Sequence, residues 1–173
     1  MKIEKLKKSI RNVPDFPRKG IQYKDITTLL QNKDVFKRTI QVFCNTFYKE
    51  KIDVIVGIES RGFIFAAPLA LELGCRFVLA RKPGKLPSKI VSKEYELEYG
   101  KDAIEMHIDA INNGDRVLVV DDLLATGGTA KATGALVERL GGEIINYAFL
   151  IELEDLKGKV LLQPNPVFSI IKY

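Results

Sequence analysis

Short apolar runs alternate along the chain with longer segments of helical periodicity. Each run is rich in β-branched residues and ends at a polar or turn residue, which is typical of strands buried on both faces of a sheet. The runs are IDVIVGI (52–58), CRFVLAR (75–81), RVLVVDD (116–122), IINYAFLIE (144–152) and VFSIIKY (167–173). The pattern predicts five strands of one sheet.

Between the runs, apolar residues recur at the spacing of one helix face. The first such set is Phe36, Ile40, Phe43 and Phe47, and the second is Ala132, Ala135, Leu136 and Leu140. The second set ends at Gly141-Gly142, which is a helix stop signal. Strands that alternate with helices predict an α/β fold, with a twisted parallel sheet flanked by helices.

Two regions depart from this alternation. Residues 12–31 contain prolines and glycine and little periodicity, whereas residues 90–108 alternate with a period of two. One side of the second region carries Tyr95, Leu97 and Tyr99, the other carries Glu94, Glu96 and Glu98, and the return segment carries Ile104, Met106 and Ile108. We expect an antiparallel ribbon over 90–108 that packs weakly on the core and acts as a mobile flap.

The composition is that of one soluble domain. The chain has 173 residues, of which 46% are hydrophobic and 28% are charged, so it is long enough to bury a core. No apolar run approaches the length of a membrane span, and the N-terminal stretch MKIEKLKKSIRNVPDF has no apolar core of a signal peptide. We therefore expect a cytoplasmic protein with no membrane partner.

The net charge of +5 leaves two classes of partner open, nucleic acid and a small anionic substrate. Lysines and arginines are spread through the chain rather than gathered in one stripe, and no RNA-binding aromatic motif is present. This distribution favours a small phosphorylated ligand over nucleic acid. Cys44 and Cys75 lie far apart without neighbouring ligands, so we expect no zinc site.

The stretch VLVVDDLLATGGTA (117–130) carries the clearest chemistry. Asp121 and Asp122 come at the carboxyl end of a buried strand, where ligands bind in parallel sheets. Ionised carboxylates only accept hydrogen bonds, and a pair of them suits a sugar diol or a metal ion. The residues that follow are Ala125, Thr126, Gly127, Gly128 and Thr129, which lead into the helix expected to begin near Ala130.

Glycines in such a loop let successive backbone N–H groups converge, and the helix N-terminus adds a positive dipole. The loop therefore predicts a phosphate site, and the carboxylates beside it predict a ribose 5-phosphate site. The stretch contains neither the GxxxxGK[ST] spacing of a Walker A loop nor the GxGxxG spacing of a dinucleotide fold.

VLVVDDLLATGGT resembles the diphosphate-ribose signature of the type I phosphoribosyltransferases. Four further segments resemble the adenine-specific members of that family in the same order, and together they cover nearly the whole chain. They are NVPDFPRKGIQYKDITTLL, GIESRGFIFAAPLALELG, LARKPGKLPSK and YELEYGKDAIEMHIDAI. The resemblance implies one domain over 1–173, with an N-terminal hood that binds the base (1–33) and the flap (90–108).

The resemblance also implies a reaction and its requirements. Adenine and 5-phosphoribosyl 1-diphosphate would give AMP and diphosphate with Mg²⁺ as the cofactor, in a homodimer. The metal would be held mainly by the ribosyl donor rather than by direct protein ligands, with help through water from Asp121 and Asp122. Two rivals remain: a phosphoribosyltransferase for a 6-oxopurine or orotate, and a regulator that senses the donor on the same fold.

The resemblance places cations and a turn at the leaving group. Glu59, Ser60 and Arg61 would form the loop around the diphosphate, and Arg61 offers a planar fork of donors. A basic cluster follows the next strand and would lower the barrier to departure of the anionic group. Its members are Arg81, Lys82 and Lys85, some of which are expected to serve a neighbouring subunit.

The base is assigned by resemblance to residues 22–24. Tyr23 would stack on the purine while backbone groups of Gln22 and Lys24 read its edge. The family often has Val, Phe and Arg at these three positions, so Lys24 lacks the planar fork of arginine. On the flap, Glu98 would face N7 of the base and Tyr99 would cover the site, which completes the catalytic set with Arg61.

Overall fold

The structure is a computed structural model that describes residues 3–96 and 101–173. It divides into two compact units, Met1–Phe43 and Cys44–Tyr173. The first unit contains α1 (Ile3–Lys7), β1 (Arg11–Pro14), β2 (Gln22–Asp25), α2 (Thr27–Leu30) and most of α3 (Lys33–Phe47). Residues 36–47, whose apolar spacing predicted a helix face, lie in α3.

Strands β1 and β2 form an antiparallel hairpin that the sequence did not predict. Its turn contains Asp15 and Gly20, which both have positive φ angles, and the Asp15 carboxylate accepts a 2.6 Å hydrogen bond from the Gly20 N–H. The prolines and glycine that obscured the pattern therefore shape the turn. Val13 faces Tyr23 in the hairpin register.

The second unit is built on a parallel sheet in the order β4-β3-β7-β8-β9. Its strands are β3 (Val54–Ile58), β4 (Arg76–Ala80), β7 (Arg116–Leu124), β8 (Glu143–Glu152) and β9 (Val167–Lys172). The other elements are α4 (Gly62–Leu73), α5 (Gly128–Arg139), η1 (Glu154–Leu156), α6 (Gly158–Leu161) and the strands β5 (Ile90–Glu96) and β6 (Lys101–His107). All five predicted strands and the predicted parallel α/β class are confirmed.

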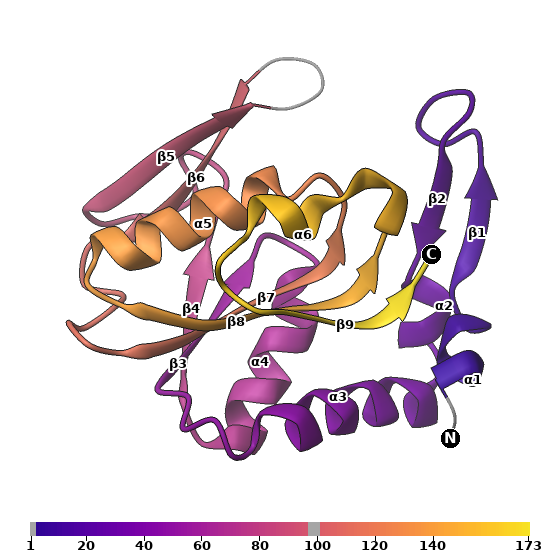
Figure 1. Ribbon diagram of the computed structural model, residues 1–173, viewed down its shortest axis with the longest axis horizontal. Coiled ribbons are helices and arrows are strands. Elements are labelled where there is room, and N and C mark those ends of the chain that lie inside the picture. Colours follow the sequence, from indigo (N-terminus) through magenta and orange to yellow (C-terminus); the bar gives the residue numbers. More distant parts are fainter. Residues whose placement is uncertain (1–2, 97–100) are drawn as a thin grey trace. The chain divides into compact units, whose positions relative to one another are not determined.

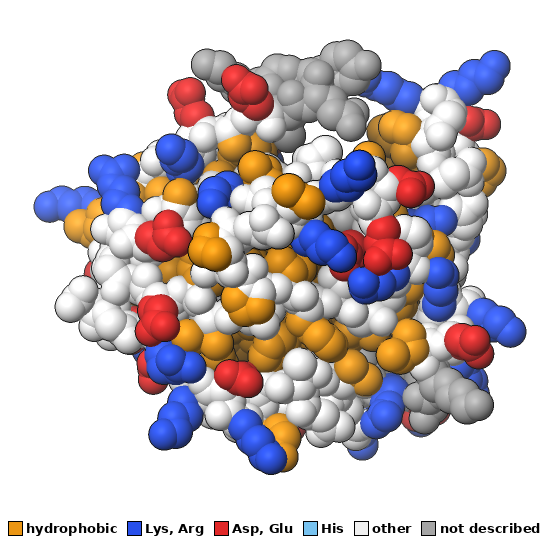
Figure 2. Space-filling view, viewed as in Figure 1, with side chains coloured by type: hydrophobic (Ala, Val, Ile, Leu, Met, Phe, Trp, Pro, Cys, Tyr) orange, Lys and Arg blue, Asp and Glu red, His pale blue; other side chains and the backbone are white. Residues whose placement is uncertain are grey.

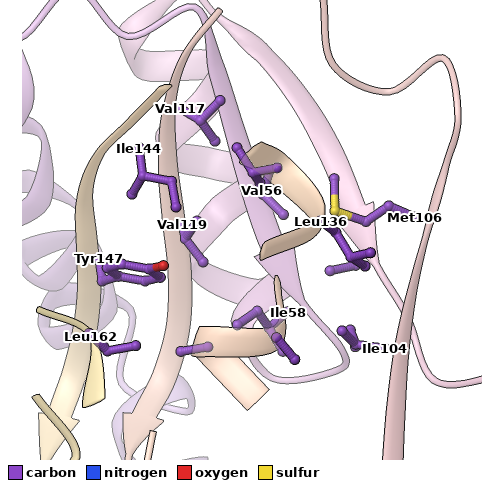
Figure 3. Packing of buried hydrophobic residues seen from close by; sticks show 14 of the residues in the cluster. Val56, Ile58, Ile104, Met106, Val117, Val119, Leu136, Ile144, Tyr147 and Leu162 are labelled. Carbon is purple, nitrogen blue, oxygen red and sulfur yellow. The ribbon is translucent and has the colours of Figure 1, made fainter. Parts of the chain in front are cut away.

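Helices cover both faces of this sheet, with α4 on one side and α5 and α6 on the other (Figure 1). On the α5 side, alternate residues of β3 and β7 such as Val56 and Val119 pack against Leu136 of α5 (Figure 3). On the α4 side, Phe65 and Leu69 are fully buried. Burial on both faces explains why these strands read as continuous apolar runs.

The order of the strands creates a switch point between β3 and β7. The chain passes from β3 outward to β4 and later returns to the other side of β3 as β7. The connections after β3 and β7 therefore leave their carboxyl ends toward opposite faces of the sheet. In open parallel sheets this is the place where ligands bind.

Strands β5 and β6 pair antiparallel over seven residue pairs, which confirms the ribbon. The expectation that the ribbon packs weakly on the core is wrong for its described part. Ile104 and Met106 are fully buried in the main core, beside α5 (Figure 3). Tyr95 packs against the same core. The period-two pattern placed one face of the ribbon on α5 and left Glu94 and Glu96 exposed.

Figure 2 shows lysines and arginines interspersed with acidic and apolar side chains over the visible face. No helix among the described residues is long and apolar enough to cross a membrane.

Candidate active site at the switch point of the sheet

The loops after β3 and β7 meet at the switch point because the two strands are hydrogen-bonded neighbours. Gly62 begins α4 directly against β7. A Cβ atom at this position would lie 2.7 Å from the Val120 carbonyl oxygen and 3.0 Å from the Asp121 carboxylate. Only glycine allows this approach, and it brings the predicted diphosphate loop beside the predicted ribose 5-phosphate site.

The loop after β7 surrounds a small pocket of about 80 Å³. The lining residues are Asp121, Leu123, Leu124, Ala125, Thr126, Gly127, Gly128, Thr129, Ala130 and Phe149. Gly127 has a φ angle of 87° and caps α5, so the loop turns directly into the first helical turn. The N–H groups of that turn lack helical partners and carry the positive end of the helix dipole, which suits a phosphate.

All five loop residues that we assigned to the phosphate from the sequence line this pocket. The helix begins at Gly128, two residues before the expected start. Leu123 and Phe149 were not assigned from the sequence, because apolar residues of a buried strand carry no pattern that separates a pocket wall from the core.

The two neighbouring carboxylates have different surroundings. Asp121 lines the pocket, whereas Asp122 is 3% exposed and forms an ion pair with Arg61 at 2.9 Å. Burial raises the pKa of Asp121 well above its ordinary value, and the Asp122 carboxylate raises it further. Burial also raises the pKa of Asp122, and the Arg61 guanidinium opposes this rise.

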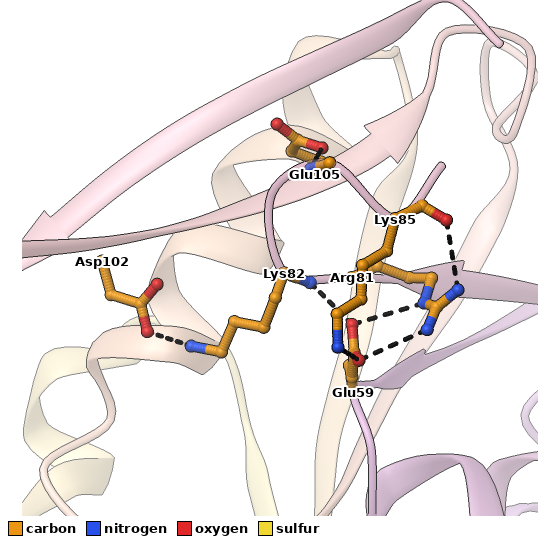
Figure 4. A network of polar contacts seen from close by, with 7 residues as sticks. Glu59, Arg81, Lys82, Lys85, Asp102 and Glu105 are labelled. Atoms are coloured by element: carbon orange, nitrogen blue, oxygen red, sulfur yellow. Dashed lines mark hydrogen bonds and ion pairs between the residues drawn. The ribbon is translucent and has the colours of Figure 1, made fainter. Parts of the chain in front are cut away.

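Glu59 lies at the centre of a polar network that joins the β3 and β4 loops (Figure 4). Its carboxylate accepts hydrogen bonds from the Arg81 guanidinium at 3.3 Å, the Lys85 Nζ at 2.7 Å and the Lys82 backbone N–H at 2.8 Å. Burial acts to raise the pKa of Glu59, but these donors outweigh it and lower the pKa to about 2. The peptide bond between Glu59 and Ser60 is cis.

The Lys82 side chain takes a different direction and binds the ribbon. Its Nζ donates to the Asp102 carboxylate and, at 2.7 Å, to the Tyr95 hydroxyl. The Lys82 ammonium lowers the pKa of Asp102 against the opposing effect of burial. The loop after β4 is also tied to β6 through Glu105, whose carboxylate accepts the Gly84 N–H at 3.0 Å (Figure 4).

The structure therefore brings the predicted basic cluster together, but around carboxylates of the same chain. Arg81 and Lys85 neutralise Glu59, and Lys82 neutralises Asp102. The sequence did not indicate Asp102 or Glu105 as partners, because they lie about 20 residues away on a strand that only the fold brings close.

Residues 22–24 lie on β2 in the first unit. Tyr23 is half-buried, with its ring edge-on to Phe16 at a centroid distance of 5.1 Å. The Gln22 side chain accepts a 2.6 Å hydrogen bond from Asn12, and Lys24 Nζ donates to the same asparagine at 2.9 Å. The other two predicted catalytic residues, Glu98 and Tyr99, lie outside the described residues.

A glycine turn that opens a helix beside an acidic pair, at the switch point of a parallel sheet, is typical of phosphoribosyl-binding domains, and the comparisons agree. A model of the phosphoribosyl transferase domain family matches residues 22–171. The chain is 51% identical over 172 residues to adenine phosphoribosyltransferase 4 of Arabidopsis thaliana. The alignment covers 99% of this chain and 94% of the relative. It is 54% identical over 168 residues to the adenine phosphoribosyltransferase of Brachyspira hyodysenteriae, and this alignment covers 97% of this chain and 99% of the relative.

Solved structures give the same result. The adenine phosphoribosyltransferase of Thermoanaerobacter pseudethanolicus superposes with a TM-score of 0.96 at 49% identity and covers 99% of both chains. The enzyme of Saccharomyces cerevisiae, solved with adenine and an imino-altritol bisphosphate, gives a TM-score of 0.92 at 43% identity and covers 97% of both chains. The chain belongs to the phosphoribosyltransferase family, in the branch of the adenine phosphoribosyltransferases.

Proposed function

We propose that the protein transfers the 5-phosphoribosyl group from 5-phosphoribosyl 1-diphosphate to adenine, giving AMP and diphosphate, as a cytoplasmic enzyme of purine salvage that does not act on nucleic acid. The observation that carries the proposal is the phosphate pocket of residues 125–129 beside Asp121 and next to the loop of residues 59–61. The relatives named above support adenine as the acceptor.

The donor is proposed to bind across the two loops. Its 5-phosphate occupies the pocket, its ribose hydroxyls bind Asp121 and Asp122, and its diphosphate contacts Ser60 and Arg61. The leaving group also competes with Glu59 for Arg81 and Lys85. Among the described residues, the Arg81 guanidinium contacts this carboxylate and the Lys85 backbone carbonyl, and the Lys85 ammonium contacts the same carboxylate. Lys82 contributes a backbone N–H at the same place.

The oxygen donors at this site fit Mg²⁺, which prefers carboxylate, water and phosphate ligands. Asp121 lines the pocket, and Asp122 is held at 2.9 Å from Arg61, so we assign Asp121 the closer approach to the metal. When bound with the donor, the metal supplies charge neutralisation at the diphosphate. The carboxylates hold the ribose and offset positive charge on its ring as the bond to the leaving group breaks.

The ribbon over 90–108 is proposed to close over the bound substrates and exclude water from the reacting sugar. In the described part of the ribbon, Ile104 and Met106 are buried in the main core. Glu98 is proposed to accept a proton from the base near N7, and Tyr99 to cover it.

We expect Glu98→Gln to lower kcat by about 10²-fold or more, because a glutamine of the same size cannot carry the proton. Donor binding should change little, since the substitution leaves the phosphate pocket intact. Steady-state kinetics with both substrates varied would measure the two effects separately. A Glu94→Gln enzyme serves as the matched control on the exposed face of the same ribbon. Full activity of the Glu98 variant would remove Glu98 from the mechanism.

The adenine ring is proposed to stack on Tyr23 while the backbone of Gln22 and Lys24 reads its edge. We expect Tyr23→Ala to raise the KM for adenine by about 5- to 100-fold, because base stacking on an aromatic ring contributes ~1–3 kcal/mol. Tyr23→Phe keeps the ring and should leave the KM near that of the wild type. An equal rise in both variants would assign the effect to the hydroxyl and contradict stacking.

The direct test of the function is a comparison of bases. Purified protein is incubated with the ribosyl donor, Mg²⁺ and radiolabelled adenine, hypoxanthine, guanine or orotate, and nucleotide formation is measured. We expect AMP formation to dominate. Turnover of hypoxanthine, guanine or orotate in place of adenine would favour the rival enzymes, and turnover of none would favour a regulator that binds the donor.

We also propose a homodimer, which β4 supports. This strand forms one edge of the sheet, and Phe77 and Leu79 on its α4 side are 37% and 36% exposed, with Phe77 packed edge-on against Phe63. On the neighbouring helix Leu71 is 85% exposed. An apolar sheet edge of this kind marks an interaction surface.

Sedimentation velocity at micromolar concentration is expected to give a dimer. Changing Phe77 and Leu71 together to lysine should shift the protein toward the monomer, because two charges would be buried in the interface. Changing the equally apolar but remote Val160, which is 58% exposed, to lysine is the control and should leave the dimer intact. A fully active wild-type monomer would contradict the proposal.

A further inference from the structure

Two glycines that are far apart in the sequence lie backbone to backbone behind the phosphate pocket. Gly127 belongs to the phosphate loop, and Gly158 begins α6. A Cβ atom on Gly127 would lie 2.6 Å from the Gly158 carbonyl oxygen, and one on Gly158 would lie well inside 3.0 Å of the Ala125 carbonyl oxygen. The first residue of α6 therefore fills the space directly behind the loop.

The burial of Gly158 agrees with this contact. Gly158 is buried, although Lys157 and Lys159 on either side of it are exposed. The positive φ angle in this turn, 52°, belongs to Lys157 rather than to Gly158. The absence of a side chain at 158 is thus required by the neighbouring loop and not by the conformation of the turn.

The segment that carries Gly158 is attached to the sheet by contacts that do not involve residues 125–129. The Leu153 N–H donates to the Leu124 carbonyl oxygen at 3.0 Å, at the end of β7. The buried Glu152 carboxylate pairs with Lys159 at 3.6 Å and with Lys172 of β9 at 4.0 Å. These contacts hold the start of α6 at a set distance from the end of β7.

We propose that Gly158 is a positioning residue for the donor phosphate. A loop with two adjacent glycines has little conformational preference of its own, so its N–H groups converge only if something outside the loop restrains it. Contact with the Gly158 backbone supplies that restraint and keeps the donors in place before the phosphate arrives. The inference rests on the proposed function, since it assumes that the pocket binds the 5-phosphate.

The test uses Gly158→Ala, whose added methyl group must displace the Ala125 carbonyl and with it the phosphate loop. Binding is measured by calorimetry with two probes, ribose 5-phosphate and magnesium diphosphate. We expect the Kd for ribose 5-phosphate to rise by about tenfold to a hundredfold, the effect of losing one N–H hydrogen bond to a charged phosphate. The Kd for diphosphate, which is assigned to the loop after β3, should stay unchanged.

Gly142→Ala is the matched control. Its methyl group would also be crowded, at 2.8 Å from Ile111 and Val137, but its nearest neighbours are side chains, and it lies beyond the opposite end of α5. It should leave both Kd values unchanged. If Gly158→Ala alone folds poorly, the same change is made together with Lys51→Gly, which relieves a positive φ angle of 50° in the loop between α3 and β3.

The outcomes separate the two proposals. A wild-type protein that does not bind ribose 5-phosphate would overturn the proposed function and this inference with it. A wild-type protein that binds it, together with a Gly158→Ala variant that binds it equally well, would overturn the inference alone. Equal losses in Gly158→Ala and Gly142→Ala, or equal losses for both probes, would also overturn it, because they would indicate general damage to the fold.

Discussion

An enzyme in which Asp121 and Asp122 are both changed to asparagine is expected to lose at least about 100-fold in kcat/KM. The change preserves the size of both side chains and removes the negative charge beside the ribose. Positive charge that develops on the sugar during bond cleavage then loses its nearest counter-charge. Steady-state kinetics with adenine and the ribosyl donor measure the loss, and near-normal turnover would contradict the proposed site.

The two single variants, Asp121→Asn and Asp122→Asn, should differ in stability. The raised pKa of Asp121 means that its ionisation opposes folding, and the resulting penalty grows as the pH rises from its ordinary pKa of 3.8 toward the raised value. Asp121→Asn is neutral at every pH and lacks this penalty, so it should melt at a higher temperature than the wild type. The difference should shrink as the pH is lowered toward 4.

Asp122→Asn should gain less stability than Asp121→Asn at neutral pH, because the Arg61 guanidinium at 2.9 Å opposes the burial that raises the pKa of Asp122. Asp109→Asn, at an exposed position, is the control and should change neither activity nor melting temperature. Melting curves from pH 4 to pH 8 test the set. A lower melting temperature for Asp121→Asn across this range would show that its charge is compensated in the folded protein.

Changing Glu59 to glutamine is expected to lower the free energy of unfolding at pH 7 by about 2–3 kcal/mol. The folded-state pKa of Glu59 is lowered from 4.5 to about 2, so its stabilising contribution is fully present above pH 4.5 and is lost as the pH falls toward 2. The amide removes the charge that Arg81 and Lys85 neutralise. The expected loss is smaller than the full pKa shift would give, because the Lys85 side chain is half exposed and solvent screens its charge.

Urea unfolding at pH 7 and at pH 3 distinguishes this contribution from a change in packing. The wild type should exceed Glu59→Gln in stability at pH 7, and the difference should be clearly smaller at pH 3, part of the way toward the folded-state pKa of about 2. Glu72→Gln, an exposed residue of α4, is the matched control and should follow the wild type at both values. An unchanged urea midpoint for Glu59→Gln at pH 7 would show that the network of Figure 4 adds nothing to stability.

The local pattern of the chain was sufficient for the strands, for two of the three long helices, α3 and α5, and for the glycine turn that opens α5. Buried parallel strands must be apolar on both faces, so the runs at 52–58 and 116–122 were visible without any knowledge of their neighbours. The loop at 125–129 was equally visible, because a phosphate pocket made of backbone N–H groups needs glycines and a helix start that are contiguous in the sequence.

Contacts between distant segments could not be read in this way. Asp121 and Asp122 look alike in the sequence, but the first lines the pocket and the second pairs with Arg61 from the loop after β3. The difference arises because successive side chains of a strand point to opposite faces, and only the strand order decides what lies on each face.

The same reason applies to the ribbon, to the basic cluster and to Gly158. Alternation at 90–108 predicted two faces, but the fold determined that one of them is buried on α5. The cations that follow β4 were visible as charges, and their carboxylate partners became clear only when β3 and β6 were placed beside them. Gly158 carries no signal of its own, because the backbone that excludes a side chain there belongs to a loop about 30 residues away.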